Sequence, residues 1–334
     1  MKQKFQWNNY LLGVGVLALV IFPFVSDSRT WTILLTQIFI FSILAMSYDI
    51  LLGYTGIVSF GHAMFFGMGA YTTAIMMKKA EPTMGIFFLS MGVGMLLAGV
   101  VSFFIGLLTL RLKSHFFAML TLAVSGLFLV LAEKWRTLTY GNDGFTFKAP
   151  EFFKDRMMFY FLVLAMLVLV YICLRRFVNS PFGRVLVAVR ENEQRTQSLG
   201  FNPLHYKVIA SVVAGVIASL AGSLYAVSLR FVNTSVLAMD ITLDALLMTI
   251  IGGVGTLIGP IVGAGIIELT QHYLSGLAKE YPIFERWIIF FGIIYILAVI
   301  FFPRGVVGTI REKMWKRQSK KSEVKPVTKK EGLG

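Results

Sequence analysis

The chain has 334 residues, of which 57% are hydrophobic, and its formal net charge is +14. Soluble domains are roughly 45–50% apolar, so this composition favours a membrane protein. The apolar residues form runs long enough to cross a bilayer, where backbone groups must be satisfied within a helix. The runs lack an alternation of period two, which argues against membrane strands.

The spans expected in chain order follow these runs. The first, near 10–25, is expected to be an uncleaved transmembrane helix, because no small-residue cleavage site follows it. The others are expected near 31–52, 57–77, 85–110, 115–132, 157–174, 208–229, 243–275 and 287–302. One helix over 243–275 would be roughly 50 Å long, more than the ~30 Å core of a bilayer. A break at its glycine and proline residues therefore predicts ten spans.

Charge placement supports this count. With the N-terminus inside, the inside segments hold 20 of the 31 Lys and Arg residues and the outside segments hold 11. This bias fits the positive-inside rule, and both termini are expected to be cytoplasmic. Nine spans would place the two most basic segments, 175–207 and the C-terminal tail, on opposite sides of the membrane.

The domain organisation expected from these patterns is a single all-α polytopic membrane domain over 1–310, with a cytoplasmic loop at 178–207. Residues 311–334 carry nine Lys or Arg and three acids, which predicts a basic, disordered cytoplasmic tail near anionic lipid. We expect no nucleic-acid partner, because the positive charges flank apolar runs. Cys173 is the only cysteine, so neither an intramolecular disulfide nor a cysteine-based metal site can form.

The 178–207 loop has the pattern of an amphipathic helix. Ser180 is a suitable cap and Pro181 suits the first turn, so a helix is expected from there to about Leu199, ending at Gly200. Such a helix could lie on lipid or dock a cytoplasmic partner. Acids among its basic residues favour the partner, because a lipid-binding helix would be more uniformly basic.

Four sequence blocks resemble one known family. They are DILLGYTGIVSFGHAMFFGMGAYT at 49–72, LRLKSHFFAMLTLA at 110–123, GRVLVAVRENE at 183–193 with LGFN at 199–202, and IGGVGTLIGPIVGA at 251–264. In this order they resemble permeases of branched-chain amino-acid ABC importers, and among these the LivM-type subunit. The resemblance covers residues 49–264.

The resemblance implies about ten spans in a BtuC-like or related ABC importer permease fold, located in the inner (cytoplasmic) membrane. It also implies a homologous second permease subunit, two cytoplasmic ATPase subunits and an extracytoplasmic substrate-binding protein. In such proteins the 183–200 region is the ATPase-coupling loop. The residues here that match it are Gly183, Arg184, Arg190, Glu191, Asn192, Glu193, Leu199 and Gly200.

The chain lacks the groups needed to hydrolyse ATP itself. Its nearest glycine-rich stretch, GGVGTLIGP, has no lysine to reach a phosphate and lies in an apolar run. ATP and magnesium are therefore expected on the partner ATPases, with no cofactor in this chain. The four histidines show no metal-ligand spacing, no catalytic triad can be argued, and no catalytic residue is expected.

Small residues and the broken stretch give candidates for a translocation path. Glycines in the third span are most simply explained by close helix packing, and lining the path is the alternative. The break near 252–260 could be only a turn, or it could present backbone groups to substrate. The candidate path residues are Gly61, His62, Gly67, Gly252, Gly253, Gly255 and Pro260.

Few ionisable residues fall within or beside the spans. Asp49 and His62 are near the expected cytoplasmic turn, where water is available, and they are expected to cap a helix end or to bond between helices. Glu268 is expected near a solvated outer end of its helix. Nothing in this set provides an ion-pair relay across the membrane.

The function expected from these observations is ATP-driven import of branched-chain amino acids by alternating access. Permeases for urea or short amides in the same family are an alternative, and so is a stand-alone secondary transporter, which would work without ATPases. An intramembrane enzyme would need a nucleophile or metal site, and neither is visible.

Overall fold

The computed structural model describes residues 13, 15, 17–25, 28–110, 114–280, 289–290, 292–293, 296, 300–301 and 305–309. Its long helices are α2 (Arg29–Asp49), which continues as a π-helix (Ile50–Thr55), α3 (His62–Lys79), α4 (Met84–Thr109), α5 (Ser114–Lys134), α7 (Arg156–Asn179), α10 (Pro203–Leu229), α11 (Met239–Gly252) and α12 (Ile258–Glu280). Shorter helices are α6 (Arg136–Thr139), α8 (Pro181–Glu191) and α9 (Glu193–Ser198). The expected all-α class is confirmed.

Short elements close the loops between these helices. They include 3₁₀ turns at Gly141–Asp143, Glu151–Lys154 and Thr234–Leu237. Strands β1 (Phe145–Thr146) and β2 (Phe231–Val232) pair antiparallel, with Phe145 opposite Val232. In the described part of the chain they are the only sheet.

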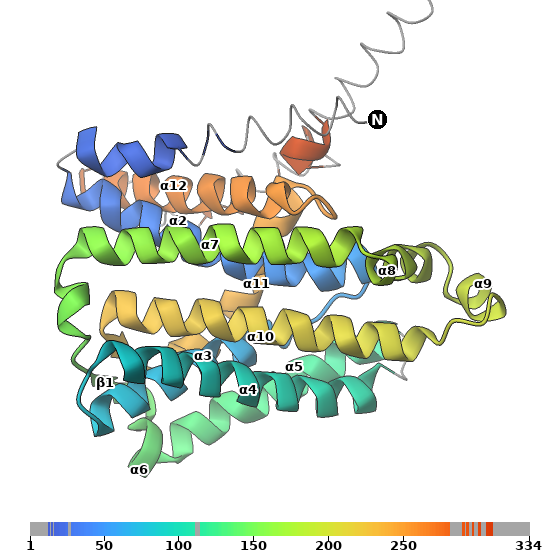
Figure 1. Ribbon diagram of the computed structural model, residues 1–334, viewed down its shortest axis with the longest axis horizontal. Coiled ribbons are helices and arrows are strands. Elements are labelled where there is room, and N and C mark those ends of the chain that lie inside the picture. Colours follow the sequence, from blue (N-terminus) through green and yellow to red (C-terminus); the bar gives the residue numbers. More distant parts are fainter. Residues whose placement is uncertain are drawn as a thin grey trace, which may run out of the picture.

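Helices α2, α4, α7, α10 and α12 run along the longest axis of the molecule and α5 lies obliquely to them, with α8 and α9 at one end and β1 and α6 at the other (Figure 1). Helix α2 lies at the centre and packs against α7, α10, α11 and α12. In its most apolar window 83% of residues are buried, against 22% for α5. The core is therefore built around α2, and α5 has an open apolar face.

Five helices in the described residues are long and apolar enough to cross a membrane: Arg29–Thr55, Met84–Thr109, Phe116–Lys134, Arg156–Asn179 and Pro203–Leu229.

Capping side chains set where several of the helices begin. Asp155 Oδ1 accepts from the Met157 amide at 2.9 Å, and Asn202 Oδ1 accepts from the Leu204 amide at 3.2 Å.

The expected break in 243–275 is confirmed, because α11 ends at Gly252 and α12 begins at Ile258. The third span begins later than expected, at His62 rather than 57. Gly56 adopts a left-handed conformation (φ +73°) and ends the π-helix, and residues 56–61 are not helical. Much of the expected first and last spans, and the tail 311–334, lie outside the described residues.

The single helix expected from 181 to about 199 is wrong. Asn192 has an extended backbone (φ −158°, ψ 102°), which separates α8 from α9. Its side-chain Oδ1 accepts from the Arg195 amide at 2.9 Å, so Asn192 caps α9. The same residue therefore stops one helix and starts the next.

Helices α3 and α10 approach until their backbones touch. A Cβ added at Gly222 would lie 1.8 Å from the Phe66 carbonyl oxygen, and one added at Gly69 would lie 1.9 Å from that of Ser219. Small residues permit this separation in membrane helices. The interface fixes α3 beside α10 along much of their length.

Candidate functional site

Helix α8 is amphipathic and lies at one end of the bundle, against α7, α10 and the π-helix (Figure 1). Its buried face is formed by Gly183, Leu186 and Val189, while Arg184 and Glu191 are exposed. A Cβ added at Gly183 would lie 2.1 Å from the Val178 carbonyl oxygen. Glycine is required at this position because α8 turns tightly onto the end of α7.

Two charged residues near Asn192, Arg190 and Glu193, have partners within the chain. Arg190 Nη1 donates a hydrogen bond to the carbonyl oxygen of Gly53 in the π-helix. Glu193 forms an ion pair with Lys207 of α10 at 2.7 Å, and the Glu193 side chain is about half exposed. Exposed pairs of this kind contribute about 0.2–1 kcal/mol. These contacts fasten both α8 and α9 to the bundle.

Beyond α9 the chain presents apolar side chains outward. Gly200 has φ +89°, which allows the sharp turn there. Leu199 is 71% exposed and Phe201 is 41% exposed. Adjacent exposed apolar residues at a loop tip are a feature of interaction surfaces.

The turn between α11 and α12 is held together by its own polar groups. Thr256 Oγ1 donates to the Gly253 carbonyl at 2.7 Å and accepts from the Gly259 amide at 3.1 Å. A Cβ added at Gly252 would lie 1.8 Å from the Gly259 carbonyl oxygen. Pro260 is buried in the first turn of α12, where its missing amide hydrogen is no loss.

The end of α2 fastens this turn to the bundle. Asp49 Oδ1 accepts from the Gly255 amide at 2.7 Å, and the Tyr54 hydroxyl donates to the Gly255 carbonyl at 3.2 Å. Gly255 has φ +76°, a conformation that favours glycine. The expectation that water reaches Asp49 is wrong, because its side chain is completely buried beneath the turn.

The beginning of α3 is also buried. The His62 ring lies 4.7 Å from that of Tyr48, and neither residue is exposed, so the expectation of a solvated His62 is wrong. The Ala63 amide donates to Thr242 Oγ1 of α11 at 2.9 Å. The non-helical residues 56–61 place the beginning of α3 beside α2 rather than in a surface turn.

The candidate path residues fall in two groups. Gly252, Gly253, Gly255 and Pro260 meet at the α11–α12 turn, whereas Gly61, His62 and Gly67 lie on or beside α3. At Gly67 the space of a side chain is filled by Leu237, since an added Cβ would lie 2.5 Å from its Cγ. Glycine allows close packing here, as it does at Gly252.

Sequence reasoning missed several buried polar residues. Glu268 was expected at a solvated helix end, but it is only 9% exposed, so that expectation is wrong. It lies about 15 Å along α12 from Ile258, at 1.5 Å per residue. Counting from the confirmed break would have placed it within the span. Thr242 and Tyr54 gave no sequence signal, because their partners are remote in the chain.

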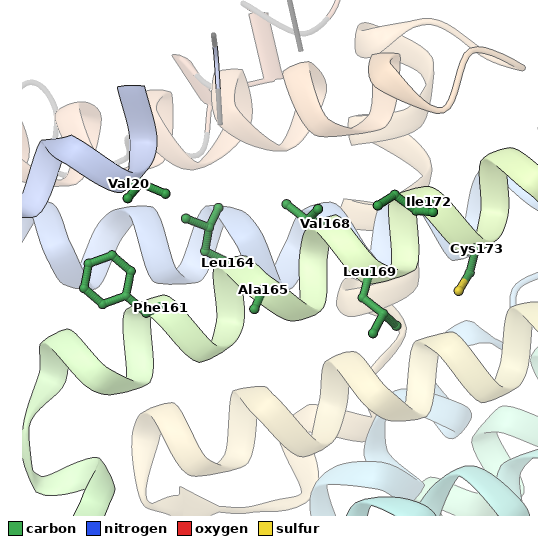
Figure 2. Close-up of a pocket in the computed structure, with 8 residues that line it drawn as sticks. All are labelled: Val20, Phe161, Leu164, Ala165, Val168, Leu169, Ile172 and Cys173. Carbon is green, nitrogen blue, oxygen red and sulfur yellow. The ribbon is translucent and has the colours of Figure 1, made fainter. Parts of the chain in front are cut away.

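The groove in Figure 2 lies on the outer flank of α7 and has a volume of about 440 Å³. It is lined by Val20, Phe161, Leu164, Ala165, Val168, Leu169, Ile172 and Cys173. Amino-acid binding requires polar groups for the ammonium and carboxylate, and this lining offers none that are charged. The groove suits a hydrocarbon chain. Within the described residues, no cluster of His, Cys, Asp or Glu could hold a metal ion.

Comparison with known proteins gives relatives along most of the chain. The LivM permease protein of the high-affinity branched-chain amino acid transport system of Escherichia coli K12 is 26% identical, over 94% of this chain and 77% of the relative. The Salmonella typhimurium LivM protein is 24% identical over the same shares. The autoinducer 2 import permease LsrC of Photorhabdus laumondii is 31% identical, over 45% of this chain and 46% of the relative. No solved structure matches.

A family model matches residues 31–299, described as the permease component of the branched-chain amino acid transport system. The match includes α2 through α12, with α8, α9 and the glycine-rich turn. It agrees with the resemblance seen in the four sequence blocks, and the relatives are membrane permeases of importers. The chain therefore belongs to the branched-chain amino acid transport permease family.

Proposed function

We propose that this chain is the membrane-spanning subunit of an ATP-driven importer of branched-chain amino acids. The observation that carries the proposal is the α8–α9 segment. It is bonded to the bundle on one side and exposes Arg184, Glu191 and Leu199 on the other. The LivM relatives, aligned over 94% of the chain, support branched-chain amino acids as the cargo.

The proposed complex contains this chain, a homologous second permease, two cytoplasmic ATPases and an extracytoplasmic binding protein. ATP and magnesium bind the ATPases and not this chain. The exposed apolar faces of α4 and α5 suit lipid and the second permease. In this proposal the membrane is the inner membrane, the α8 end faces the cytoplasm, and both termini are expected on that side as well.

The proposed mechanism is alternating access without covalent chemistry. ATP binding closes the two ATPases and displaces α8 and α9. That displacement changes the arrangement of α3, α11 and α12, where the candidate path residues lie, and opens the path to one side at a time. Leucine, isoleucine or valine delivered by the binding protein then crosses.

The test is uptake of radiolabelled leucine into proteoliposomes that contain the complete complex. Uptake should require ATP on the side of the vesicle membrane where the ATPases lie. It should stop when the ATPases are omitted. A Leu199→Asp variant should lose ATPase binding, because it places a charge on the exposed loop tip, whereas Leu96→Asn on the outer face of α4 should retain it. Uptake that persists without ATPases would instead support a secondary transporter.

The LsrC relatives favour a second candidate cargo, autoinducer 2, and urea or short amides remain alternatives within the family. Competition distinguishes them in the same vesicles. Excess unlabelled isoleucine should suppress leucine uptake, while urea, acetamide and autoinducer 2 should not.

A further inference from the structure

Three segments that are remote in sequence meet at Gly53. It lies in the π-helix that ends the first described span, beside Gly255 of the α11–α12 turn and Arg190 of α8. A Cβ added at Gly53 would lie 2.6 Å from the Gly255 amide nitrogen, so the two backbones are in contact. Helix α8 and the break between α11 and α12 therefore share one neighbour, Gly53.

Arg190 caps the π-helix from outside. The last carbonyl groups of a helix lack donors within it, and the Arg190 guanidinium supplies one to the Gly53 carbonyl. Its positive charge is also favourable at a helix C-terminus. The stem of the side chain lies over Gly56, where an added Cβ would be 3.1 Å from Arg190 Cγ. A larger residue at position 56 would displace the arginine.

The same helix end holds the turn from two sides. Asp49 accepts from the Gly255 amide and Tyr54 donates to the Gly255 carbonyl, at 2.7 and 3.2 Å. A shift of α8 therefore reaches the turn through a few directional hydrogen bonds. Arg184 and Arg190 are both exposed, but among the described residues the Arg184 side chain makes no hydrogen bond or ion pair, whereas that of Arg190 bonds to Gly53.

We propose that Arg190 is a positioning residue that couples α8 to the α11–α12 break, rather than a contact for the ATPase. It transmits the displacement of α8 to the end of α2, and Asp49 and Tyr54 pass it to Gly255. Arg184, by contrast, is free to face the ATPase. This inference rests on the proposed function, since it assigns a role within the ATP-driven cycle.

The test is the number of substrate molecules carried per ATP hydrolysed by the reconstituted complex. Arg190→Gln should keep the ATPases bound and hydrolysing ATP, while this ratio falls on the order of tenfold, within the range of coupling between sites. Arg190→Lys should recover part of the ratio, because it keeps a cation at the helix end. Arg176→Gln, an exposed arginine at the end of α7, should leave the ratio unchanged.

A purely structural role would lower assembly, hydrolysis and transport together and leave their ratio unchanged. Release of the ATPases by Arg190→Gln, or an unchanged ratio, overturns the proposal. If Arg190→Gln does not fold or insert into the membrane, Tyr54→Phe tests the same connection without altering α8. It should also lower the ratio, and an unchanged ratio in Tyr54→Phe overturns the proposal.

A second measurement needs no knowledge of the substrate. In a Cys173→Ser background, which removes the only cysteine, Val254→Cys places a label site in the turn. Its maleimide labelling rate should change on ATP addition, and Arg190→Gln should abolish the change. Equal responses with and without Arg190 overturn the inference. If the wild-type complex shows the ATP-dependent change in labelling rate but no ATP-dependent uptake, only the proposed function is contradicted.

Discussion

The α3–α10 interface and the α11–α12 turn both depend on glycine, yet glycine does different work in each. Between α3 and α10, Gly69 and Gly222 let two regular helices touch along their backbones. In the turn, Gly255 adopts a left-handed conformation, its amide donates one hydrogen bond to Asp49 and its carbonyl accepts one from Tyr54. The first region is fixed by backbone contact along two regular helices, whereas the second combines close packing at Gly252 with single directional hydrogen bonds at Gly255. We call the α3–α10 interface the frame and the α11–α12 turn the joint.

The largest effect should come from filling the frame. Gly222→Ala would place its Cβ 1.8 Å from the Phe66 carbonyl, so α3 and α10 must separate. We expect a loss of at least about 3 kcal/mol of stability, as in severe overpacking. Thermal unfolding of the purified protein measures it. Gly92→Ala on α4, with nothing within 4 Å, is the matched control and should unfold at or above the wild-type temperature. Equal behaviour of the two variants would remove the distinction between frame and joint.

A smaller effect should follow from loosening the joint. Asp49→Ala leaves the partly buried Gly255 amide without its acceptor, which costs about 1–3 kcal/mol. Asp49→Asn retains an oxygen that can accept the same hydrogen bond, so it should cost less. Unfolding temperatures of the two variants measure the difference. The hypothesis that this bond holds the turn is wrong if Asp49→Asn is as destabilised as Asp49→Ala.

The smallest effect should come from removing a polar contact within the frame. Ser102 and Ser211 are hydrogen bonded between α4 and α10 at 3.0 Å. Such bonds between membrane helices average about 0.6 kcal/mol, so Ser211→Ala should lower the unfolding temperature only slightly. Ser102→Ala with Ser211→Ala should add little to the single variant, because the bond is already lost. A large loss from Ser211→Ala would mean that polar contacts, and not close packing, hold the frame.

Sequence patterns predicted where the helices lie better than which of their residues are buried. Apolar length and glycine with proline located the main spans and the break in 243–275, because each signal is local. The interruption at Asn192 was visible in principle, since asparagine favours caps, but the amphipathic pattern suggested one helix. The burial of Glu268 could have been inferred by counting along α12 from the break. That of Asp49 and His62 could not, because their neighbours come from segments remote in the chain.

The candidate site shows the same limit. Charge pattern and family resemblance indicated the 183–200 segment as a unit, and the structure divides its charged residues by their contacts. Arg184, Arg190, Glu191 and Glu193 are all exposed, but of these four only Arg190 and Glu193 bond to other described parts of the chain through their side chains. A helical wheel cannot make this division, because it depends on where Gly53 and Lys207 lie in three dimensions.

The bond between Asp49 and Gly255 has a consequence for the synthesis and membrane insertion of the protein. Its two residues are 206 positions apart in the chain. At synthesis rates of about 5–20 residues per second, Gly255 is made roughly 10–40 s after Asp49. Throughout that interval a carboxyl group at the end of the first described span lacks its native hydrogen-bond donor, the Gly255 amide. The insertion machinery, or water at the membrane surface, must accommodate Asp49 until the second half of the chain arrives.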